Sequence, residues 1–330
     1  MNFKKLITTG IMAMVTLTTF AEPTVTDVVA KQRYPWNGLV DITCKVTGIS
    51  GSDQWKFSVA AVMPDTGNAR KVSQFWVVKN GVNSTDKKVQ ANGTYKLLWD
   101  ASADLGQVSY DNMVIRVNVV ELHDKVQLWE GGPYWADTNI GADEPEDYGY
   151  YFWWGDTVGY KRENDKWVAT DGSSLDFSFS DSNTPTFGKD NATLQNQGWI
   201  TADGVLAPEH DAAHVHWGGD WRMPTSDEIQ ALISNCTTKW ITTNGVSGRL
   251  VTGKGAYEDR SIFLPAAGDG LDSFLRGSGL YGDYWSSSPD SDNLFSDFAW
   301  HLNFDSSDFR RYFNPRSRGQ SVRPVRGFAE

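Results

Sequence analysis

"WGGDWRMPTSDEIQALI" (Trp217–Ile233) holds the clearest helix signal in the chain and decides how its C-terminal half is interpreted. Thr225 or Ser226 is a typical N-cap residue. Asp227 and Glu228 follow in the first turn, where carboxylates interact favourably with the helix dipole. The apolar residues that come next recur at helical spacing and share one predicted buried face: Ile229, Leu232, Ile233 and Cys236.

Short apolar runs around this helix predict strands joined by long loops. They are "SIFLPAAG" (261–268), "GDYWSSS" (282–288), "FAWHLNF" (298–304) and "SVRPVRGF" (321–328). One capped helix among many short strands predicts an α+β domain over residues 123–330.

The N-terminal half has a different rhythm. Apolar or alternating runs are separated by Gly, Asn, Asp and Ser clusters at regular spacing, which favours an antiparallel β-sandwich, immunoglobulin- or fibronectin-like, over residues 22–122. The predicted strands are "TVTDVVAKQRY" (24–34), "LVDITCKV" (39–46), "QWKFSVAAV" (54–62), "SQFWVVKN" (73–80), "GTYKLLWDA" (93–101) and "NMVIRVNVVE" (112–121).

The first residues are typical of a secretory signal peptide. Lys4 and Lys5 precede a short apolar run, and small residues lead to a predicted cleavage point after Ala21. We therefore expect a protein that is secreted, periplasmic or at the cell surface, with no membrane insertion in its mature form. Loss of the two lysines takes the net charge from −11 to −13. Such an acidic chain is an unlikely partner for nucleic acid, because it repels phosphate backbones.

The only two cysteines are predicted to be buried thiols in different cores. Cys44 alternates with Val40, Ile42 and Val46 on one strand face, and Cys236 continues the apolar face of the predicted helix. A disulfide between the two domains is the alternative, because export usually means an oxidising compartment.

Four blocks carry a resemblance to a known family: "WADTNIGADEPEDYGYYFWWGDT" (135–157), "WGGDWRMPTSDEIQALI" (217–233), "GDYWSSS" (282–288) and "GQSVRPVRGF" (319–328). Their order and spacing over residues 127–328 resemble the Fibrobacter succinogenes major paralogous domain. That family is similar to the C-type-lectin-like fold in its formylglycine-generating-enzyme branch. The resemblance implies that the first and last strands of the domain lie close together. It also implies a variable loop surface and no established enzymatic activity.

Some relatives of this fold are diversified by retroelements between "YWSSS" and "SVRPV", and the segment from Asp290 to Asn314 occupies that place. The residues themselves predict a contact surface there: "AWHLNFD" alternates Trp300, Leu302 and Phe304 toward the core with polar residues facing out, and a loop follows. The candidate ligand-binding residues are His301, Asn303, Asp305, Asp308, Phe309, Arg311, Tyr312, Phe313 and Asn314. The alternative is that Phe309 and Phe313 fold back into the core.

Metal sites and catalysis have weaker support. In "EHDAAHVHW", His210, His214 and His216 are weak candidates for a zinc site, and capping or exposed roles are favoured instead. "GADEPEDYG" (141–149) has acidic calcium-type ligands, but it departs from the Glu-Pro-Asn and Trp-Asn-Asp patterns of calcium-dependent lectins. The cysteines of formylglycine-generating enzymes and a nucleophile-elbow motif are not found in the sequence, so we expect no enzyme and no cofactor.

Arg222 and Arg323 occupy the signature blocks among apolar residues, and we expect both to be internal ties to carboxylates or carbonyls. The resulting hypothesis is a secreted, non-enzymatic binding protein that recognises a protein or cell-surface ligand. A polysaccharide ligand is the first alternative. A structural envelope or matrix component without a specific ligand is the second.

Overall fold

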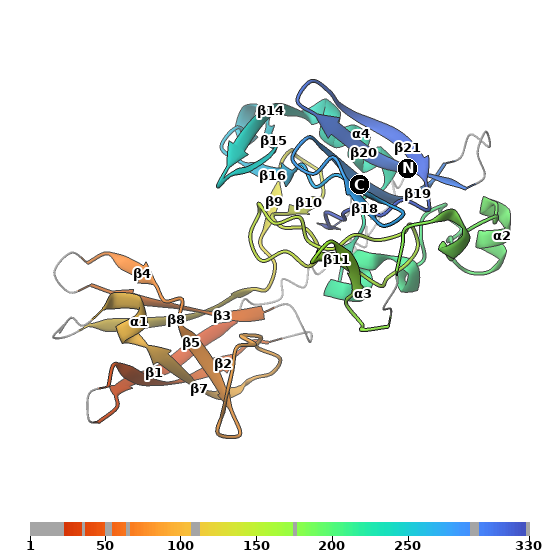
Figure 1. Cartoon of the computed structure of the whole chain (residues 1–330). Helices are drawn as coiled ribbons and strands as arrows, with labels where there is room; N and C mark the ends of the chain where they lie inside the picture. The colour runs from red at the N-terminus through yellow and green to blue at the C-terminus, as the bar shows by residue number, and fades with distance from the viewer. Residues whose placement is uncertain are drawn as a thin grey trace, which may run out of the picture. The chain divides into compact units, whose positions relative to one another are not determined.

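The computed structural model describes residues 23–34, 37–49, 55–63, 67–106, 113–173, 177–290 and 297–327 (Figure 1). The fold is mostly β-sheet, with several antiparallel sheets. The chain divides into two compact units, Met1–Val120 and Glu121–Glu330. The predicted signal peptide lies outside the described residues.

In the described part of the chain, no helix is both long and apolar enough to cross a membrane.

In the part of the N-terminal unit that the structure describes, the strands form two sheets. The five-stranded sheet has the order β1-β2-β7-β5-β6, and the three-stranded sheet has the order β4-β3-β8. Its elements are β1 (Thr24–Gln32), β2 (Leu39–Thr47), β3 (Trp55–Val62), β4 (Ala69–Lys71), β5 (Phe75–Lys79), β6 (Val82–Ser84), β7 (Gly93–Asp100), α1 (Ala101–Leu105) and β8 (Val114–Glu121). All six predicted strands are present, with ends that shift by one or two residues in most cases.

The core of this unit follows from the alternation along its strands. Ile42, Cys44 and Val46 on β2 are fully buried, and Phe57 and Val59 alternate in the same way on β3. All five belong to one apolar cluster with residues of both sheets. Burial also raises the pKa of the Cys44 thiol to about 11. Cys44 and Cys236 are both buried and free, as predicted.

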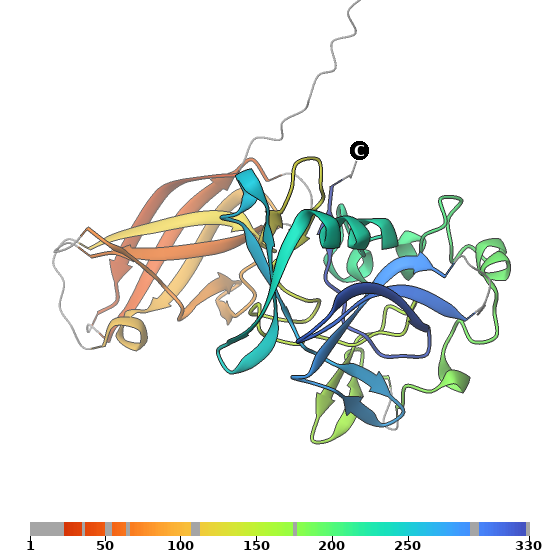
Figure 2. The same ribbon diagram turned by 90° about the horizontal axis from the view of Figure 1, so that it is seen from above.

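The C-terminal unit contains several small sheets and short helices (Figure 2). Its sheet orders are β13-β22-β10-β9, β14-β15-β16, β19-β20-β21, β11-β12 and β17-β18. The strands are β9 (Lys125–Gln127), β10 (Tyr134–Ala136), β11 (Tyr160–Glu163), β12 (Lys166–Ala169), β13 (Trp221–Arg222), β14 (Cys236–Thr243), β15 (Val246–Gly253), β16 (Ser261–Pro265), β17 (Asp269–Leu271), β18 (Phe274–Arg276), β19 (Tyr281–Pro289), β20 (Phe298–Asp305), β21 (Phe309–Pro315) and β22 (Val325–Arg326).

The described residues of this unit also form three α-helices and three short 3-10 helices: η1 (Asp181–Asn183), α2 (Asn191–Asn196), η2 (Pro208–His210), α3 (Ala212–Trp217), α4 (Ser226–Asn235) and η3 (Gly255–Tyr257). The first and last parts of the unit meet in one sheet, because Trp135 of β10 pairs with Val325 of β22. The pairing agrees with what the resemblance implied.

Helix α4 begins as the sequence predicts. Thr225 is its N-cap: the side chain accepts a hydrogen bond from the Glu228 backbone N–H, and the Glu228 side chain accepts one from the Thr225 N–H. This capping box satisfies two backbone groups that the helix itself cannot pair. Ile229, Leu232 and Cys236 are buried in a cluster that includes residues of β15, β16 and β20.

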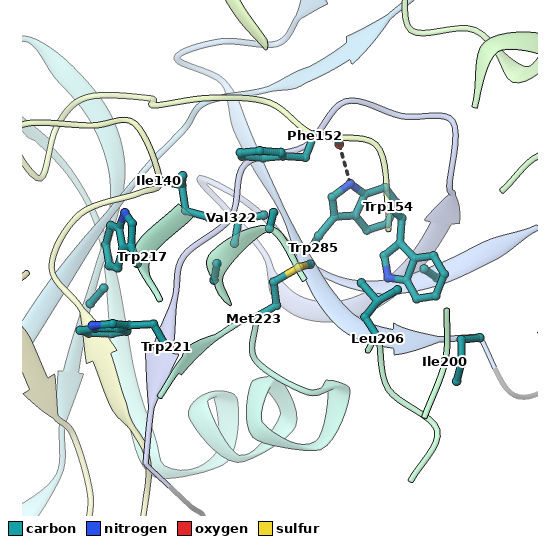
Figure 3. Close-up of a cluster of buried hydrophobic side chains, with 14 of the residues drawn as sticks. Ile140, Phe152, Trp154, Ile200, Leu206, Trp217, Trp221, Met223, Trp285 and Val322 are labelled. Atoms are coloured by element: carbon teal, nitrogen blue, oxygen red, sulfur yellow. Dashed lines mark hydrogen bonds between the residues drawn. The ribbon is translucent and has the colours of Figure 1, made fainter. Parts of the chain in front are cut away.

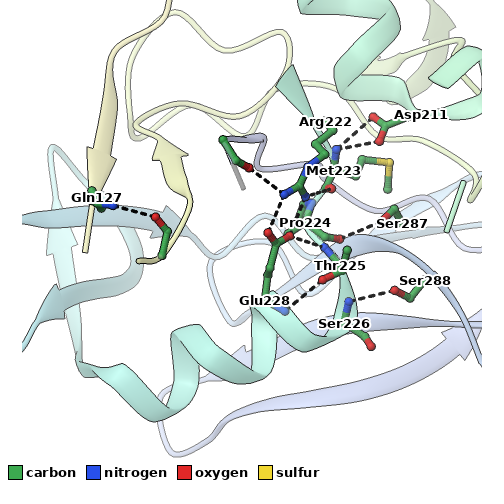
Figure 4. A network of polar contacts seen from close by, with 12 residues as sticks. Gln127, Asp211, Arg222, Met223, Pro224, Thr225, Ser226, Glu228, Ser287 and Ser288 are labelled. Atoms are coloured by element: carbon green, nitrogen blue, oxygen red, sulfur yellow. Dashed lines mark hydrogen bonds and ion pairs between the residues drawn. The ribbon is translucent and has the colours of Figure 1, made fainter. Parts of the chain in front are cut away.

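Arg222 and Arg323 are internal ties, as predicted. The Arg222 guanidinium donates to both Glu228 carboxylate oxygens at 2.7 and 2.6 Å and to the Gly327 carbonyl at 3.0 Å (Figure 4). Arg323 is 1% exposed and donates to Asn139 Oδ1 and to the carbonyls of Ala136, Asp137 and Phe263. Both arginines fix segments that are far apart in sequence.

A second apolar cluster is built largely from tryptophan. Trp217 and Trp221 lie at one end of it and Trp154 at the other (Figure 3). Trp285 is fully buried between them, and its indole N–H donates to the Phe152 carbonyl at 2.9 Å. This cluster connects α3 to the sheet of β19, so a domain with short strands obtains a large part of its core from aromatic side chains.

Candidate functional site

The predicted ligand-binding residues lie on one β-hairpin. β20 and β21 pair in continuous register from Phe298↔Pro315 to Phe304↔Phe309. The prediction of a loop after Asp305 is therefore wrong: only a short turn follows it, and residues 309–315 form the last strand of the sheet β19-β20-β21. Residues 291–296 of the predicted contact segment lie outside the described part of the chain.

Asp305 and Asp308 have local structural roles in this turn. Asp305 Oδ1 accepts hydrogen bonds from the backbone N–H groups of Ser307 at 2.7 Å and Asp308 at 2.8 Å. The Ser307 hydroxyl also donates to Asp305 Oδ1 at 2.8 Å, and this hydrogen bond, followed by the two from the backbone, lowers the pKa of the Asp305 carboxyl. Asp308 forms an ion pair of 3.0 Å with Arg310. The two carboxylates therefore fix the end of the hairpin.

Side chains of β21 alternate between two faces, and the predicted site residues divide between them. Phe309, Arg311 and Phe313 share the face of Leu302 and Phe304, which pack in the cluster that contains the α4 residues. Tyr312 and Asn314 share the opposite face with His301 and Asn303. We call this second face the outer face: His301, Asn303, Arg310, Tyr312 and the neighbouring Asp283.

The three residues on the α4 side are committed to packing. Phe309 packs against the cluster of α4 and β20. Arg311 donates to Asp227 Oδ1 at 3.2 Å, and its guanidinium lies 4.6 Å from the centre of the Trp300 ring. Phe313 is half-buried, with its ring centre 5.9 Å from that of Trp300. The alternative that the phenylalanines pack inward thus describes Phe309 and, in part, Phe313.

His301 is not exposed, which corrects the prediction that it faces solvent. It is 2% exposed, and its Nδ1 lies 3.1 Å from Gln320 Oε1 and 3.4 Å from Asp283 Oδ1. Gln320 is also fully buried, and the centre of the Tyr312 ring lies 6.4 Å from that of the imidazole. The imidazole is therefore enclosed by neighbouring side chains.

Burial favours the uncharged form of both His301 and Asp283. It lowers the pKa of His301 to about 3 and raises the pKa of Asp283 to about 7. The nearby Asp269 raises the Asp283 pKa further, whereas a hydrogen bond from Asn303 and the charges of Arg276 and Arg318 oppose the shift. The 3.4 Å contact between the two side chains is therefore not an ion pair, because burial favours the uncharged form of each.

Arg310 and Tyr312 form the solvent-facing part of the outer face. Tyr312 is 46% exposed, and the Arg310 guanidinium lies 5.0 Å from the centre of its ring. Arg310 Nε donates to Asn303 Oδ1 at 3.3 Å, while Asn303 Nδ2 donates to Asp283 Oδ1 at 2.7 Å. Asn303 therefore connects the exposed arginine to the buried carboxyl.

Several residues of this environment were not predicted. Asp269 is fully buried, pairs with Arg276 through two hydrogen bonds of 3.1 and 2.5 Å, and accepts a third from the Tyr281 hydroxyl at 2.6 Å. In the described part of the chain, three buried atoms near Asp283 have no hydrogen-bond partner: His301 Nε2, Gln320 Nε2 and Arg318 Nη1. Only the cross-strand register, which the sequence does not show, brings Asp283 to Asn303.

The three histidines do not form a metal site. His210 stacks on Trp199 with ring centres 3.7 Å apart, and His216 Nε2 lies 2.8 Å from the Thr157 carbonyl oxygen. Asp211 caps α3 by accepting a hydrogen bond from the His214 backbone N–H. Among the described residues, no three His, Cys, Asp or Glu side chains are grouped to hold a metal ion.

The acidic turn at residues 141–149 is held by its own side chains. Asp147 Oδ2 accepts from the backbone N–H groups of Asp143 and Glu144, and Glu146 accepts from the Asn244 amide at 2.6 Å. These carboxylates already have protein partners, so their geometry favours a structural turn.

The chain matches no family model, and neither a curated protein nor a solved structure matches it at a significant level.

Proposed function

We propose that this protein is an exported, non-enzymatic binding protein whose C-terminal unit has a C-type-lectin-like fold and whose N-terminal unit is an immunoglobulin-like sandwich. The sequence blocks support the first assignment, together with the pairing of β10 at the beginning of the unit with β22 at its end. Two sheets that share one core support the second.

The outer face is the proposed ligand-binding surface, and the pair of Arg310 and Tyr312 carries this assignment. Both side chains are exposed, and they are positioned by a strand rather than a loop. Binding to such a surface costs little conformational entropy, because the backbone is already ordered by the ladder with β20. The buried network beneath holds Asn303, which in turn contacts Arg310.

A protein or cell-surface ligand fits this pair best. Tyr and Arg are enriched among the residues that dominate protein interfaces, and Tyr contributes a large contact area with few rotatable bonds. A polysaccharide is the alternative ligand, because an exposed aromatic ring also stacks on sugars. A structural component without a specific ligand is the alternative function.

The experiment compares two matched aromatic–cation pairs of the same unit. Arg310→Ala and Tyr312→Ala remove the proposed site, while Lys125→Ala and Tyr134→Ala remove a similar pair on β9 and β10, where the Lys125 ammonium lies 5.3 Å from the Tyr134 ring centre. Each variant and the unchanged protein are tested on a glycan array and on an array of surface proteins from its habitat.

We expect saturable binding that is lost in the first two variants and kept in the second two, with unchanged melting temperatures throughout. Binding on the glycan array alone would identify the polysaccharide alternative. Absence of saturable binding by the unchanged protein would favour the structural alternative. A ligand that binds the double variant Arg310→Ala/Tyr312→Ala normally would refute the assignment of the site.

A further inference from the structure

A pocket of about 470 Å³ lies in the C-terminal unit, away from the residues of the outer face. Its lining comes from the turn at residues 201–205, the start of α3, β13 and the N-cap of α4. Figure 4 shows Asp211, Arg222, Thr225 and Ser287, which lie on its lining. Its volume is within the range of pockets that bind small organic molecules.

One part of the lining is apolar and rigid. Leu206 and Trp221 are buried in the tryptophan-rich cluster, and Val205 and Pro208 add further apolar surface. Two backbone hydrogen bonds fix this wall, from Leu206 N–H to the Ser287 carbonyl at 2.9 Å and from Thr201 N–H to the Val205 carbonyl at 2.8 Å. A ligand with a hydrocarbon body can therefore bury it here without a large rearrangement.

The charged groups favour a cation over an anion. Among the described residues of the lining Arg222 is the only arginine, and Glu228 already neutralises it through two hydrogen bonds. Asp203 is exposed at the pocket, and Asp211 is buried beneath it. Desolvation raises the pKa of the Asp211 carboxyl, although the backbone N–H groups of His214 and Met223 donate to it. A cation in the pocket would stabilise the ionised Asp211 carboxylate, whereas an anion would destabilise it further.

A short turn positions Asp203, the exposed carboxylate of the lining. Thr201 begins this turn, but its hydroxyl oxygen is buried away from solvent and does not contact a ligand in the pocket. Thr201 and Asp203 lie on the same turn, which is closed by a hydrogen bond of 3.0 Å from Gly204 N–H to the Thr201 carbonyl.

We propose that this pocket binds a small organic ammonium ion. The hydrocarbon part of the ligand packs on Leu206, Pro208 and Trp221. The ammonium group donates hydrogen bonds to the exposed Asp203 carboxylate. This ligand is independent of the partner proposed for the outer face.

Three probes of nearly equal size test the charge preference: 2-phenylethylamine, 2-phenylethanol and 3-phenylpropionate. We expect calorimetric titration of the full mature chain to show the amine binding about tenfold more tightly than the alcohol, because hydrogen bonds to charged groups are the stronger ones. We expect no measurable binding of the carboxylate. Equal affinities for the amine and the carboxylate, or binding of none of the three, would overturn the proposal.

Two isosteric variants locate the interaction. Asp203→Asn removes one exposed charge, so we expect it to fold normally and to reduce the amine affinity to about that of the alcohol. Asp259→Asn removes an exposed carboxylate outside the lining, and we expect unchanged affinity. Tyr312→Ala should bind the amine normally, which separates this site from the outer face. An Asp203→Asn variant with full amine affinity would refute the assigned contact.

Discussion

Asp283 and Asn303 face each other across the β19–β20 ladder, and the Asn303 amide joins the buried Asp283 carboxyl at 2.7 Å to the exposed Arg310 guanidinium at 3.3 Å. One amide side chain therefore links the interior of the sheet to its solvent-facing surface. The protonation state of Asp283 affects how firmly this link is held, because an ionised carboxylate accepts stronger hydrogen bonds than a neutral one. The outer face thus rests on a group that titrates near neutral pH.

The first prediction concerns the pH dependence of stability. The pKa of Asp283 in the fold is about 7, above its ordinary value of 3.8. The group therefore contributes stability that is fully present below about pH 4 and is lost as the pH rises through 7. Because Asp283→Asn removes this loss, the variant should gain stability relative to the unchanged protein between pH 5 and pH 8, by at most about 3 kcal/mol. Urea unfolding at both pH values measures the difference.

His301 has the opposite sign and provides the internal comparison. Its pKa is lowered to about 3, so it contributes stability that is present above about pH 6.5 and lost as the pH falls through 3. With Asp283 replaced by Asn, the variant should lose stability on acidification from pH 6.5. A difference between variant and unchanged protein that stays constant from pH 5 to pH 8 would contradict the assigned pKa of Asp283.

β2, β3 and β5 of the N-terminal unit were predictable because one face of each is buried. Ile42, Cys44 and Val46 alternate with more exposed residues, so the period of two is visible in the sequence. The hairpin of β14 and β15 was missed, although a local signal was present. Asn244 and Gly245 both have positive φ, 49° and 83°, and Asn-Gly is the dipeptide preferred in such two-residue hairpin turns.

β21 was missed for a different reason. Arg311 stands at a position that faces α4, where an apolar residue would have completed the alternation of Phe309 and Phe313. A charged residue is tolerated there because Asp227 at the start of α4 pairs with it. The burial of His301 was equally invisible, because it depends on Gln320, which follows 19 residues later in the chain. Contacts between distant segments thus decide the parts of the site that local patterns cannot predict.

The second prediction concerns the tie at the start of α4. Glu228→Ala removes the acceptor for Arg222 and one half of the capping box. It also leaves the guanidinium of a partly buried arginine without its carboxylate. We expect the free energy of unfolding to fall by about 3 kcal/mol, measured by chemical denaturation.

Asp227→Ala in the same helical turn is the matched control. Its side chain is 94% exposed and pairs with Arg311 at 3.2 Å, so the expected loss is below about 1 kcal/mol. Similar losses for the two variants would argue against a special role of the Arg222–Glu228 pair.

The third prediction concerns Arg323, whose partners are an amide oxygen and three backbone carbonyls. Arg323→Lys keeps the charge but cannot reproduce this planar arrangement of donors. We expect it to destabilise the C-terminal unit by about 3 kcal/mol or more, because several buried acceptors lose their hydrogen bonds. Arg310→Lys on the exposed face is the control, with a change of less than about 0.5 kcal/mol in thermal unfolding. A melting temperature of Arg323→Lys equal to that of the control would show that a buried ammonium group can replace the guanidinium without loss of stability.

The last prediction concerns the close contact between the Phe179 ring and Gly319. A Cβ atom at Gly319 would lie 2.4 Å from the Phe179 ring, and Phe179 is fully buried. Gly319→Ala should therefore cost about 1–3 kcal/mol through overpacking. Phe179→Leu alone also destabilises, because it leaves a cavity. In the double variant the smaller leucine side chain leaves room for the added methyl group. The combined loss of stability should therefore be less than the sum of the two single losses. Strictly additive losses in urea unfolding would show that the two residues do not compete for the same space.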